Sequence, residues 1–180
     1  LACGMLPSAG GRRSLVSMQT SLRCKLVCVK SRQGRARASS LRAPGDSLDP
    51  MRIATWNVNS IRARSGRVID WMVRADIDVL AMQEIKCKPE QFPREVFEEA
   101  GYELEIHGLS QWNGVAFASR LPMSDPEITF ADMPGFGKPT PEGTLPLEAR
   151  ALGVTVEDVR LWSLYVPNGR ELTNDHYPYK

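Results

Sequence analysis

The apolar residues of this chain come in short runs, and the length of those runs limits what the chain can fold into. The runs at 78–82 and 161–166 are typical. Each is far shorter than the roughly 20 apolar residues that a membrane-spanning helix needs, but it has the length of a buried β-strand. The sequence therefore predicts a core built on strands and gives no indication of a membrane segment.

From residue 51 onward the expected strands alternate with two helices. Strands are predicted, from their residue preferences and turn signals, at 51–58, 78–82, 102–107, 115–119, 149–156 and 159–166. Helices are predicted over about eleven residues from Ser65 or Gly66, and at 93–100, where Gly101 provides a C-terminal cap. Residues 122–146 contain six prolines and three glycines and are predicted to form an irregular surface loop. This order is typical of a layered α/β domain.

The first 50 residues differ in composition from the rest. They carry nine Lys or Arg and two Asp, whereas residues 51–180 carry fourteen Lys or Arg and nineteen Asp or Glu. With no sustained apolar period to offset the entropy of ordering, residues 1–50 are expected to be a disordered basic leader. They have three interpretations: an organelle transit peptide, upstream sequence translated from a misplaced start, or a basic arm that neutralises nucleic-acid phosphates. The second is preferred, because Met51 opens a strand at once.

The cysteines indicate a reducing compartment. Cys3, Cys24 and Cys28 lie in the leader at spacings that match neither a paired zinc motif nor a secreted disulfide framework, and they are assigned no role. Cys87 stands alone in residues 51–180 and is most simply a reduced thiol. We therefore expect a cytoplasmic protein of bacterial type, or an organelle protein if the leader is a transit peptide.

Polar residues that could carry chemistry follow three of the predicted strands. Asn57 and Asn59 lie at the end of the strand predicted at 51–58, Glu84 follows the strand at 78–82, and Tyr165 and Asn168 lie at the end of the strand at 159–166. A carboxylate after an apolar strand is partly desolvated yet reachable, which suits a hard cation, and a phenol with an amide can hold and polarise a phosphodiester. Each residue alone also has an ordinary interpretation, as a turn former or a surface side chain. Their occurrence at successive strand ends favours a shared site.

The order and spacing of four stretches resemble the exonuclease III and abasic-site endonuclease family. These stretches are Ile53-Ala-Thr-Trp-Asn-Val-Asn-Ser-Ile-Arg-Ala-Arg64, Asp78-Val-Leu-Ala-Met-Gln-Glu-Ile-Lys-Cys87, Asn113-Gly-Val-Ala-Phe-Ala-Ser-Arg120 and Tyr165-Val-Pro-Asn-Gly-Arg170. The resemblance covers residues 51–180 and implies the N-terminal half of a nuclease domain.

The fold implied by this resemblance is α/β: a two-sheet α/β sandwich flanked by helices, of the endonuclease/exonuclease/phosphatase type, truncated to roughly its first half. We expect such a chain to carry mainly one of the two sheets. Strands such as 161–166 would then face water, which favours aggregation, so the chain by itself is expected to be poorly stable and inactive.

The activity implied by the resemblance is that of an exodeoxyribonuclease III-like, Mg²⁺-dependent DNA-repair phosphodiesterase, with Mn²⁺ as a substitute. Such an enzyme acts as a 3′–5′ exonuclease on duplex DNA and as an AP endonuclease. The implied partner is double-stranded DNA with abasic sites or 3′ ends, no membrane is involved, and a monomer is expected.

The resemblance also implies roles for individual residues. Glu84 is similar to the metal-ligand carboxylate, and Asn59 occupies a position near the metal. Asn57 is similar to an asparagine of the catalytic hydrogen-bond network. Tyr165 is similar to the tyrosine that contacts the scissile phosphate, with Asn168 close by.

Two further residues match family positions that contact DNA. Arg62 matches a residue that touches backbone phosphate, and Trp112 matches a loop residue that lies against the duplex. Each has a second interpretation, because an arginine near a strand end is often only solvated and Trp112 could cover the edge of the core.

Some of the family's catalytic residues have no counterpart in this sequence. They are the Asp and Asn of a Gly-Asp-x-Asn motif, a further Asp, and an Asp-His pair; the dipeptide at 175–176 corresponds to the start of a helix instead. Two alternative functions remain open. One is a related sandwich phosphatase or phosphodiesterase acting on inositol phosphates or lipids, and the other is a noncatalytic nucleic-acid-binding chain that uses the basic leader.

Overall fold

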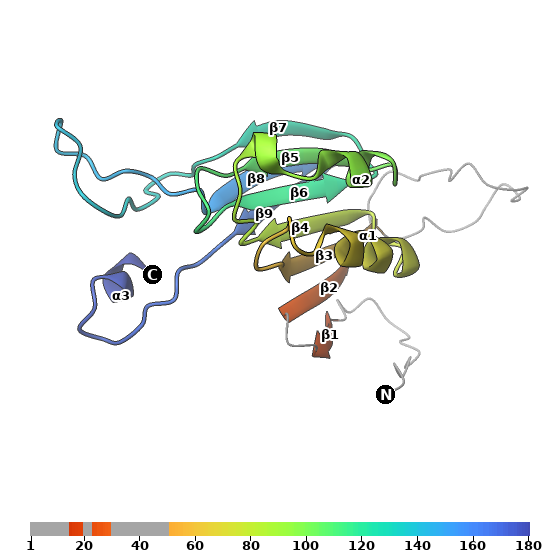
Figure 1. Cartoon of the computed structure of the whole chain (residues 1–180), viewed down its shortest axis with the longest axis horizontal. Coiled ribbons are helices and arrows are strands. Elements are labelled where there is room, and N and C mark those ends of the chain that lie inside the picture. The colour runs from red at the N-terminus through yellow and green to blue at the C-terminus, as the bar shows by residue number, and fades with distance from the viewer. Residues whose placement is uncertain (1–14, 20–22, 30–50) are drawn as a thin grey trace, which may run out of the picture.

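The computed structural model describes residues 15–19, 23–29 and 51–180, and it contains two β-sheets packed face to face with helices on one outer side (Figure 1). The first sheet has six strands in the order β1-β2-β3-β4-β6-β5, and the second has three in the order β7-β8-β9. The predicted two-sheet α/β sandwich is confirmed.

The first sheet is centred on two parallel strands, β3 (Met51–Asn57) and β4 (Val79–Gln83). A parallel pair needs a crossover connection, and here α1 (Ser65–Arg74) provides it. The other pairs are antiparallel: β4 with β6 (Val115–Ser119), β6 with β5 (Glu103–His107), β3 with β2 (Arg23–Val29), and β2 with β1 (Leu15–Gln19).

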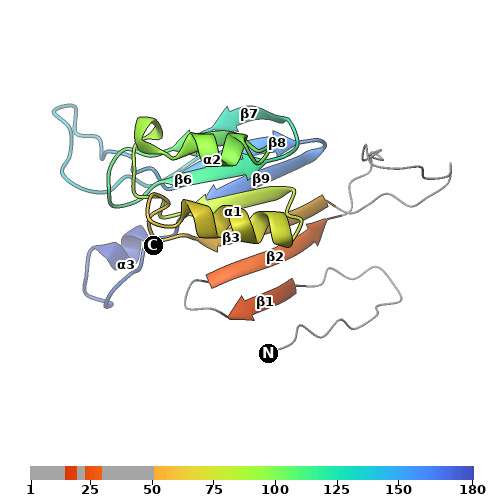
Figure 2. The same ribbon diagram turned by 45° about the vertical axis from the view of Figure 1, so that its right-hand side comes forward.

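The second sheet is an antiparallel meander. It consists of β7 (Met123–Glu127), β8 (Ala151–Val156) and β9 (Val159–Leu164). The turn between β8 and β9 is tight, and Glu157 in it has a left-handed backbone with φ 53°. β8 and β9 lie against β4 and β6 of the first sheet (Figure 2).

Strand β4 is buried on both faces, because each face of the first sheet is covered. Leu80 and Met82 contribute to the core beneath α1 and α2 (Arg94–Glu98), whereas Val79 and Ala81 contribute to the core between the sheets. This alternation follows from the two-residue period of a strand. It explains why the sequence here is a continuous apolar run rather than an alternating one.

Most of the predicted elements agree with the structure, and two short helices complete it. The predicted helix at 93–100 is α2, and Gly101 follows it with φ 81°, as its capping role requires. A 3₁₀ helix lies at Pro89–Gln91, and α3 (His176–Tyr179) ends the chain. Within the described residues, no helix has the length and apolar character needed to cross a bilayer.

The prediction of an irregular loop over 122–146 is wrong at its start, where β7 forms. The strand carries Pro126 and is mostly exposed, so its own sequence gives little strand signal. Its ladder with β8 shifts register between Ser124 and Glu127. Proline is tolerated at such an irregularity on an edge strand, and β7 occupies the edge of its sheet.

The expectation of mainly one sheet is also wrong. Residues 123–164 supply three strands of the second sheet, and Phe117, Leu152 and Val154 are fully buried between the two sheets. Within the run 161–166, the exposed side chains are those at its end, Leu164 at 46% and Val166 at 56%. Beside β9 the two sheets leave a cavity of about 260 Å³.

Two segments of the leader differ from the expectation of disorder, because residues 15–19 and 23–29 form β1 and β2. Their backbones extend the first sheet beyond β3. The rest of residues 1–50 lies outside the described residues.

Candidate active site at the strand ends

The site lies where β3, β4 and β9 end and β6 begins, at the end of the sandwich that also carries α3 (Figure 1). Beyond the strands the chain stays paired. Backbone hydrogen bonds of 2.7 to 3.2 Å join residues 58–61 to 83–85, and residues 85–86 to 113–114. These bonds hold three loops side by side, so polar residues that are distant in sequence come together.

The backbone turns sharply as it leaves β3 and β4. Asn59, Ser60, Glu84 and Lys86 have φ values of 43°, 82°, 54° and 54°. For residues other than glycine this left-handed region is sparsely populated and costs about 1–2 kcal/mol each. The turns end the strand alternation directly at the polar residues, and they set the directions of the Glu84 and Lys86 side chains.

Glu84 is the centre of the site. Its Oε1 accepts a hydrogen bond from Asn57 Nδ2 at 2.6 Å, and its Oε2 forms an ion pair with Lys86 Nζ at 3.0 Å. Burial is the largest single influence on the pKa of Glu84 and would raise it. Hydrogen bonds from Asn57, Lys86 and Tyr165, together with the charge of Lys86, outweigh burial, so the pKa lies below its ordinary value. Glu84 is therefore ionised at neutral pH.

Asn59 also contacts Lys86. Its side-chain Oδ1 accepts a hydrogen bond from Lys86 Nζ at 2.6 Å, while its backbone N–H donates to Asn57 Oδ1 at 3.1 Å. Arg64 donates a further hydrogen bond to the Asn59 carbonyl. Asn57 thus forms a turn with Asn59 through its side-chain oxygen and donates from its side-chain nitrogen to the carboxylate of Glu84.

Tyr165 approaches Glu84 from the end of β9. Burial raises the pKa of the Tyr165 hydroxyl, and the charge and hydrogen bond of Glu84 raise it further, although Arg150 opposes them. The hydroxyl is therefore protonated at neutral pH and can act as a donor. The guanidinium carbon of Arg150 lies 4.6 Å from the centre of the Tyr165 ring, and the Tyr165 backbone N–H donates to the Arg150 carbonyl at 2.8 Å.

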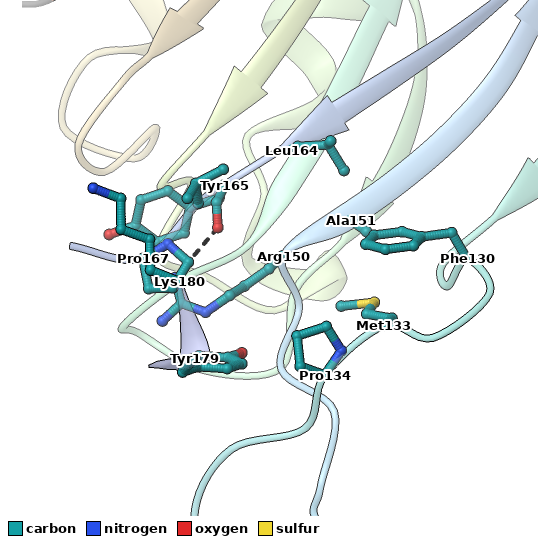
Figure 3. Close-up of a pocket in the computed structure, with 11 residues that line it drawn as sticks. Phe130, Met133, Pro134, Arg150, Ala151, Leu164, Tyr165, Pro167, Tyr179 and Lys180 are labelled. Atoms are coloured by element: carbon teal, nitrogen blue, oxygen red, sulfur yellow. Dashed lines mark hydrogen bonds between the residues drawn. The ribbon is translucent and has the colours of Figure 1, made fainter. Parts of the chain in front are cut away.

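Arg150, which Figure 3 shows with Tyr165 and Tyr179, is held in place by a second set of contacts. Its Nε donates to Glu148 Oε2 at 2.6 Å, and its guanidinium carbon lies 5.6 Å from the Tyr179 ring centre. Glu148 also accepts hydrogen bonds from the Tyr179 hydroxyl at 3.0 Å and from Asn113 Nδ2 at 3.1 Å. The network therefore connects the site tyrosine to α3 and to the loop that precedes β6. A largely apolar pocket of about 120 Å³ lies beside it.

The oxygen atoms of the site suit a hard divalent cation. The Glu84 carboxylate and the Asn59 side-chain Oδ1 both point to the position that Lys86 Nζ occupies. Mg²⁺ is often bound through only one or two carboxylates and keeps several waters. No group of three or more His, Cys, Asp or Glu side chains in the described part of the chain could hold a metal. A cation at this point would therefore meet one carboxylate and one amide oxygen from these two residues.

The structure brings together four of the seven predicted site residues: Asn57, Asn59, Glu84 and Tyr165. Asn168 is exposed, and its Oδ1 accepts a hydrogen bond from the Arg170 backbone N–H, as in an ordinary turn. No described hydrogen bond connects Asn168 with Glu84.

The two predicted DNA-contact residues lie at the rim. Arg62 is exposed and directly follows the paired segment 58–61. Trp112 is 73% exposed in the loop that pairs with residues 85–86, so it does not cover the core edge.

Sequence reasoning gave no role to Lys86, Glu148 or Arg150. Lys86 stands only two residues from Glu84, which is the signal that could have identified it. Arg150 carries a weaker signal, since its position directly before β8, beside the end of β9, becomes apparent only once the β8–β9 pairing is known.

Comparison with known proteins identifies a matching family. Residues 54–176 match the model of the Endonuclease/Exonuclease/phosphatase family. Exodeoxyribonuclease III of Haemophilus influenzae is 34% identical over 70 residues, which are 39% of this chain and 26% of that protein.

Two solved structures are similar over a longer range. An AP endonuclease from Archaeoglobus fulgidus is 32% identical with a TM-score of 0.59, and the 3′ phosphatase NExo from Neisseria, bound to a product DNA hairpin, is 29% identical with a TM-score of 0.62. Each match covers 72% of this chain and 46% of the other. The chain thus spans about a quarter of the curated relative and about half of each solved chain.

Proposed function

Because this chain belongs to the endonuclease/exonuclease/phosphatase family, we propose that its site serves Mg²⁺-dependent hydrolysis of DNA phosphodiesters, as in exodeoxyribonuclease III and AP endonucleases. The observation that carries the proposal is the convergence of Asn57, Asn59, Glu84 and the Tyr165 hydroxyl at one end of the sandwich. These groups match what a phosphodiester hydrolase needs for binding a cation and a phosphate.

Each residue has a defined part in this proposal. Glu84 and Asn59 hold the cation, and Asn57 fixes the orientation of the Glu84 carboxylate through its 2.6 Å hydrogen bond. When bound, Mg²⁺ supplies Lewis-acid stabilisation of the negative charge on the phosphate. Tyr165 keeps its proton because its pKa is raised, so it donates a hydrogen bond to a phosphate oxygen.

The proposed substrate is duplex DNA with an abasic site or a 3′ end. The names of the relatives support DNA, since they are an exodeoxyribonuclease, an AP endonuclease and a phosphatase bound to a DNA hairpin. The exposed Arg62 and Trp112 would contact the duplex, because a guanidinium pairs with backbone phosphate and an aromatic ring packs against bases or sugars.

We further propose that the 180-residue chain by itself binds this DNA but hydrolyses it poorly. The site has groups for the cation and the phosphate, but no counterpart of the family residues that orient the attacking water is present in the sequence. General acid–base groups of this kind contribute about 10²- to 10⁴-fold to rate.

The test is metal-dependent binding followed by cleavage. A fluorescent duplex with one tetrahydrofuran abasic site is titrated with the chain in Mg²⁺ and in EDTA, with inositol phosphate as competitor. Binding should be stronger in Mg²⁺ and resist the competitor, and Glu84→Gln should lose the Mg²⁺ effect while Glu90→Gln, at an exposed position, keeps it. Displacement by inositol phosphate would instead support a sandwich phosphatase. Rapid cleavage by the chain alone would refute the poor hydrolysis but not the site.

A further inference from the structure

Lys86 occupies the position where the two proposed metal ligands meet. Its Nζ lies 3.0 Å from Glu84 Oε2 and 2.6 Å from Asn59 Oδ1. We propose that the Lys86 ammonium is the resting cation of this site, and that a divalent cation binds there only after displacing it. This inference rests on the metal site of the proposed function.

The contacts of Lys86 are those of a cation ligand set rather than of a surface ion pair. Glu84 is its only ion-pair partner among the described residues, and the second contact is a neutral amide oxygen on a different loop. A surface lysine normally gains little from one carboxylate and keeps its rotamer freedom. Lys86 instead contacts two oxygens from two loops. These oxygens belong to Glu84 and Asn59, the same two residues that the family resemblance gives as Mg²⁺ ligands.

Both cations cannot occupy this point. Glu84 supplies one negative charge, which neutralises the ammonium in full but a divalent ion only by half. An ammonium and a divalent cation this close would repel each other even in a water-like dielectric, and more strongly in a partly buried site. Binding of the divalent cation therefore requires the ammonium to move away.

The structure allows that movement. The Lys86 backbone is fixed by its hydrogen bond to the Asn113 carbonyl at 2.9 Å and by its left-handed turn. Its side chain is 29% exposed, whereas that of Glu84 is 18% exposed. Four rotatable bonds thus connect a fixed backbone to an ammonium at the solvent boundary, so the ammonium can leave while Glu84 and Asn59 stay in place.

The opposite hypothesis is that Lys86 merely positions Glu84 for the metal. The two hypotheses predict opposite changes in the affinity for the divalent cation when the Lys86 ammonium is removed. If Lys86 competes with the divalent cation, the Lys86→Gln chain binds the cation more tightly. If Lys86 only orients the carboxylate, the same substitution weakens binding.

The experiment measures Mn²⁺ affinity of the full chain by electron paramagnetic resonance of the free ion, without DNA. We expect Lys86→Gln to bind about fivefold more tightly than wild type, which is the ratio expected on loss of a competing ion pair. Lys86→Arg, which keeps a cation, should bind as weakly as wild type. Lys88→Gln, the same charge change at an exposed position two residues away, should leave affinity unchanged.

A second measurement follows the ammonium itself. Displacement exposes Lys86, so Mn²⁺ should increase its rate of acetylation by acetic anhydride, read by mass spectrometry with Lys88 as internal reference. Equal or weaker Mn²⁺ binding by Lys86→Gln, or an unchanged acetylation rate, would overturn the inference.

Failure of the proposed metal site gives a different pattern. Glu84→Gln should abolish Mn²⁺ binding in wild type and in the Lys86→Gln background. If neither wild type nor Lys86→Gln binds Mn²⁺ in the millimolar range, the metal site and this inference both fail. If both bind equally and both depend on Glu84, only the inference fails.

Discussion

The guanidinium of Arg150 stacks on the ring of Tyr165, with 4.6 Å between the guanidinium carbon and the ring centre. Glu148 and Tyr179 hold the guanidinium from its other sides. The orientation of the site tyrosine is thus set by a residue that is fifteen positions earlier in the chain and has no direct contact with Glu84 among the described hydrogen bonds and ion pairs.

We expect Arg150→Met to free the Tyr165 ring and to raise the pKa of its hydroxyl further, because Arg150 acts to lower it. Tyrosine-ring ¹³C NMR titrated with pH measures both effects, with the Tyr165 signal assigned from Tyr165→Phe. Arg150→Lys, which keeps the charge, should restore part of the pKa. Arg160→Met is the matched control, because it also removes an arginine that stacks on an aromatic ring. The guanidinium carbon of Arg160 lies 5.1 Å from the ring centre of Trp162, and both residues belong to β9. Identical spectral changes in both Met variants would contradict a specific role.

The stability that Glu84 contributes should depend on pH in a defined direction. Its pKa is lower in the folded chain than the ordinary value of 4.5. Its ionised form is therefore favoured by folding, and the contribution is present above the unfolded pKa and lost as pH falls through the folded pKa. Urea unfolding of wild type and Glu84→Gln should show the largest difference in free energy near pH 7 and a smaller one well below pH 4.5. A difference that grows on acidification would show that the pKa is raised.

Gly114→Ala should destabilise the chain and disturb the site loop. Gly114 has φ 103°, and a Cβ there would lie 2.6 Å from Ile85 Cγ1. We expect a loss of about 2–4 kcal/mol in unfolding free energy, from backbone strain and the clash together. Gly101→Ala separates the two causes, because Gly101 has φ 81° but open space around it, and it should lose only about 1 kcal/mol. Equal losses in urea unfolding would mean that the contact with Ile85 is unimportant.

Ser163 should contribute to the joining of the two sheets. From β9 its hydroxyl donates to the Met82 carbonyl at 2.9 Å and accepts from Gln83 Nε2 at 3.1 Å, both on β4. Ser163→Ala leaves these buried groups without this partner, so we expect a loss of about 1–3 kcal/mol. Ser124→Ala, at an exposed position of β7, should change stability by less than about 0.5 kcal/mol. Thermal and urea unfolding measure both variants.

Much of the fold could be predicted because its signals are local. The run at 78–82 and the helical spacing after Ser65 correspond to β4 and α1. β7 could not be predicted, since Met-Ser-Asp-Pro-Glu is polar and holds a proline, and its strand form comes from pairing with β8.

The site was predictable to the extent that its residues follow strands directly. Asn57 ends β3 and Glu84 directly follows β4, so their proximity follows from the parallel pairing of these two strands. The role of Lys86 depends on two left-handed turns, and that of Arg150 on the register of β8 and β9. The residue types at these positions predict neither the left-handed turns nor the register.

The left-handed turns after β3 and β4 also limit how this site could be transplanted. A design that placed Asn and Glu at the ends of two ordinary parallel strands would reproduce the residue types but not the backbone at Asn59, Ser60, Glu84 and Lys86. Since idealised scaffolds avoid such conformations at residues other than glycine, a grafted site would have to include residues 57–61 and 83–86 as intact backbone units, together with the loop at 113–114 that pairs with them.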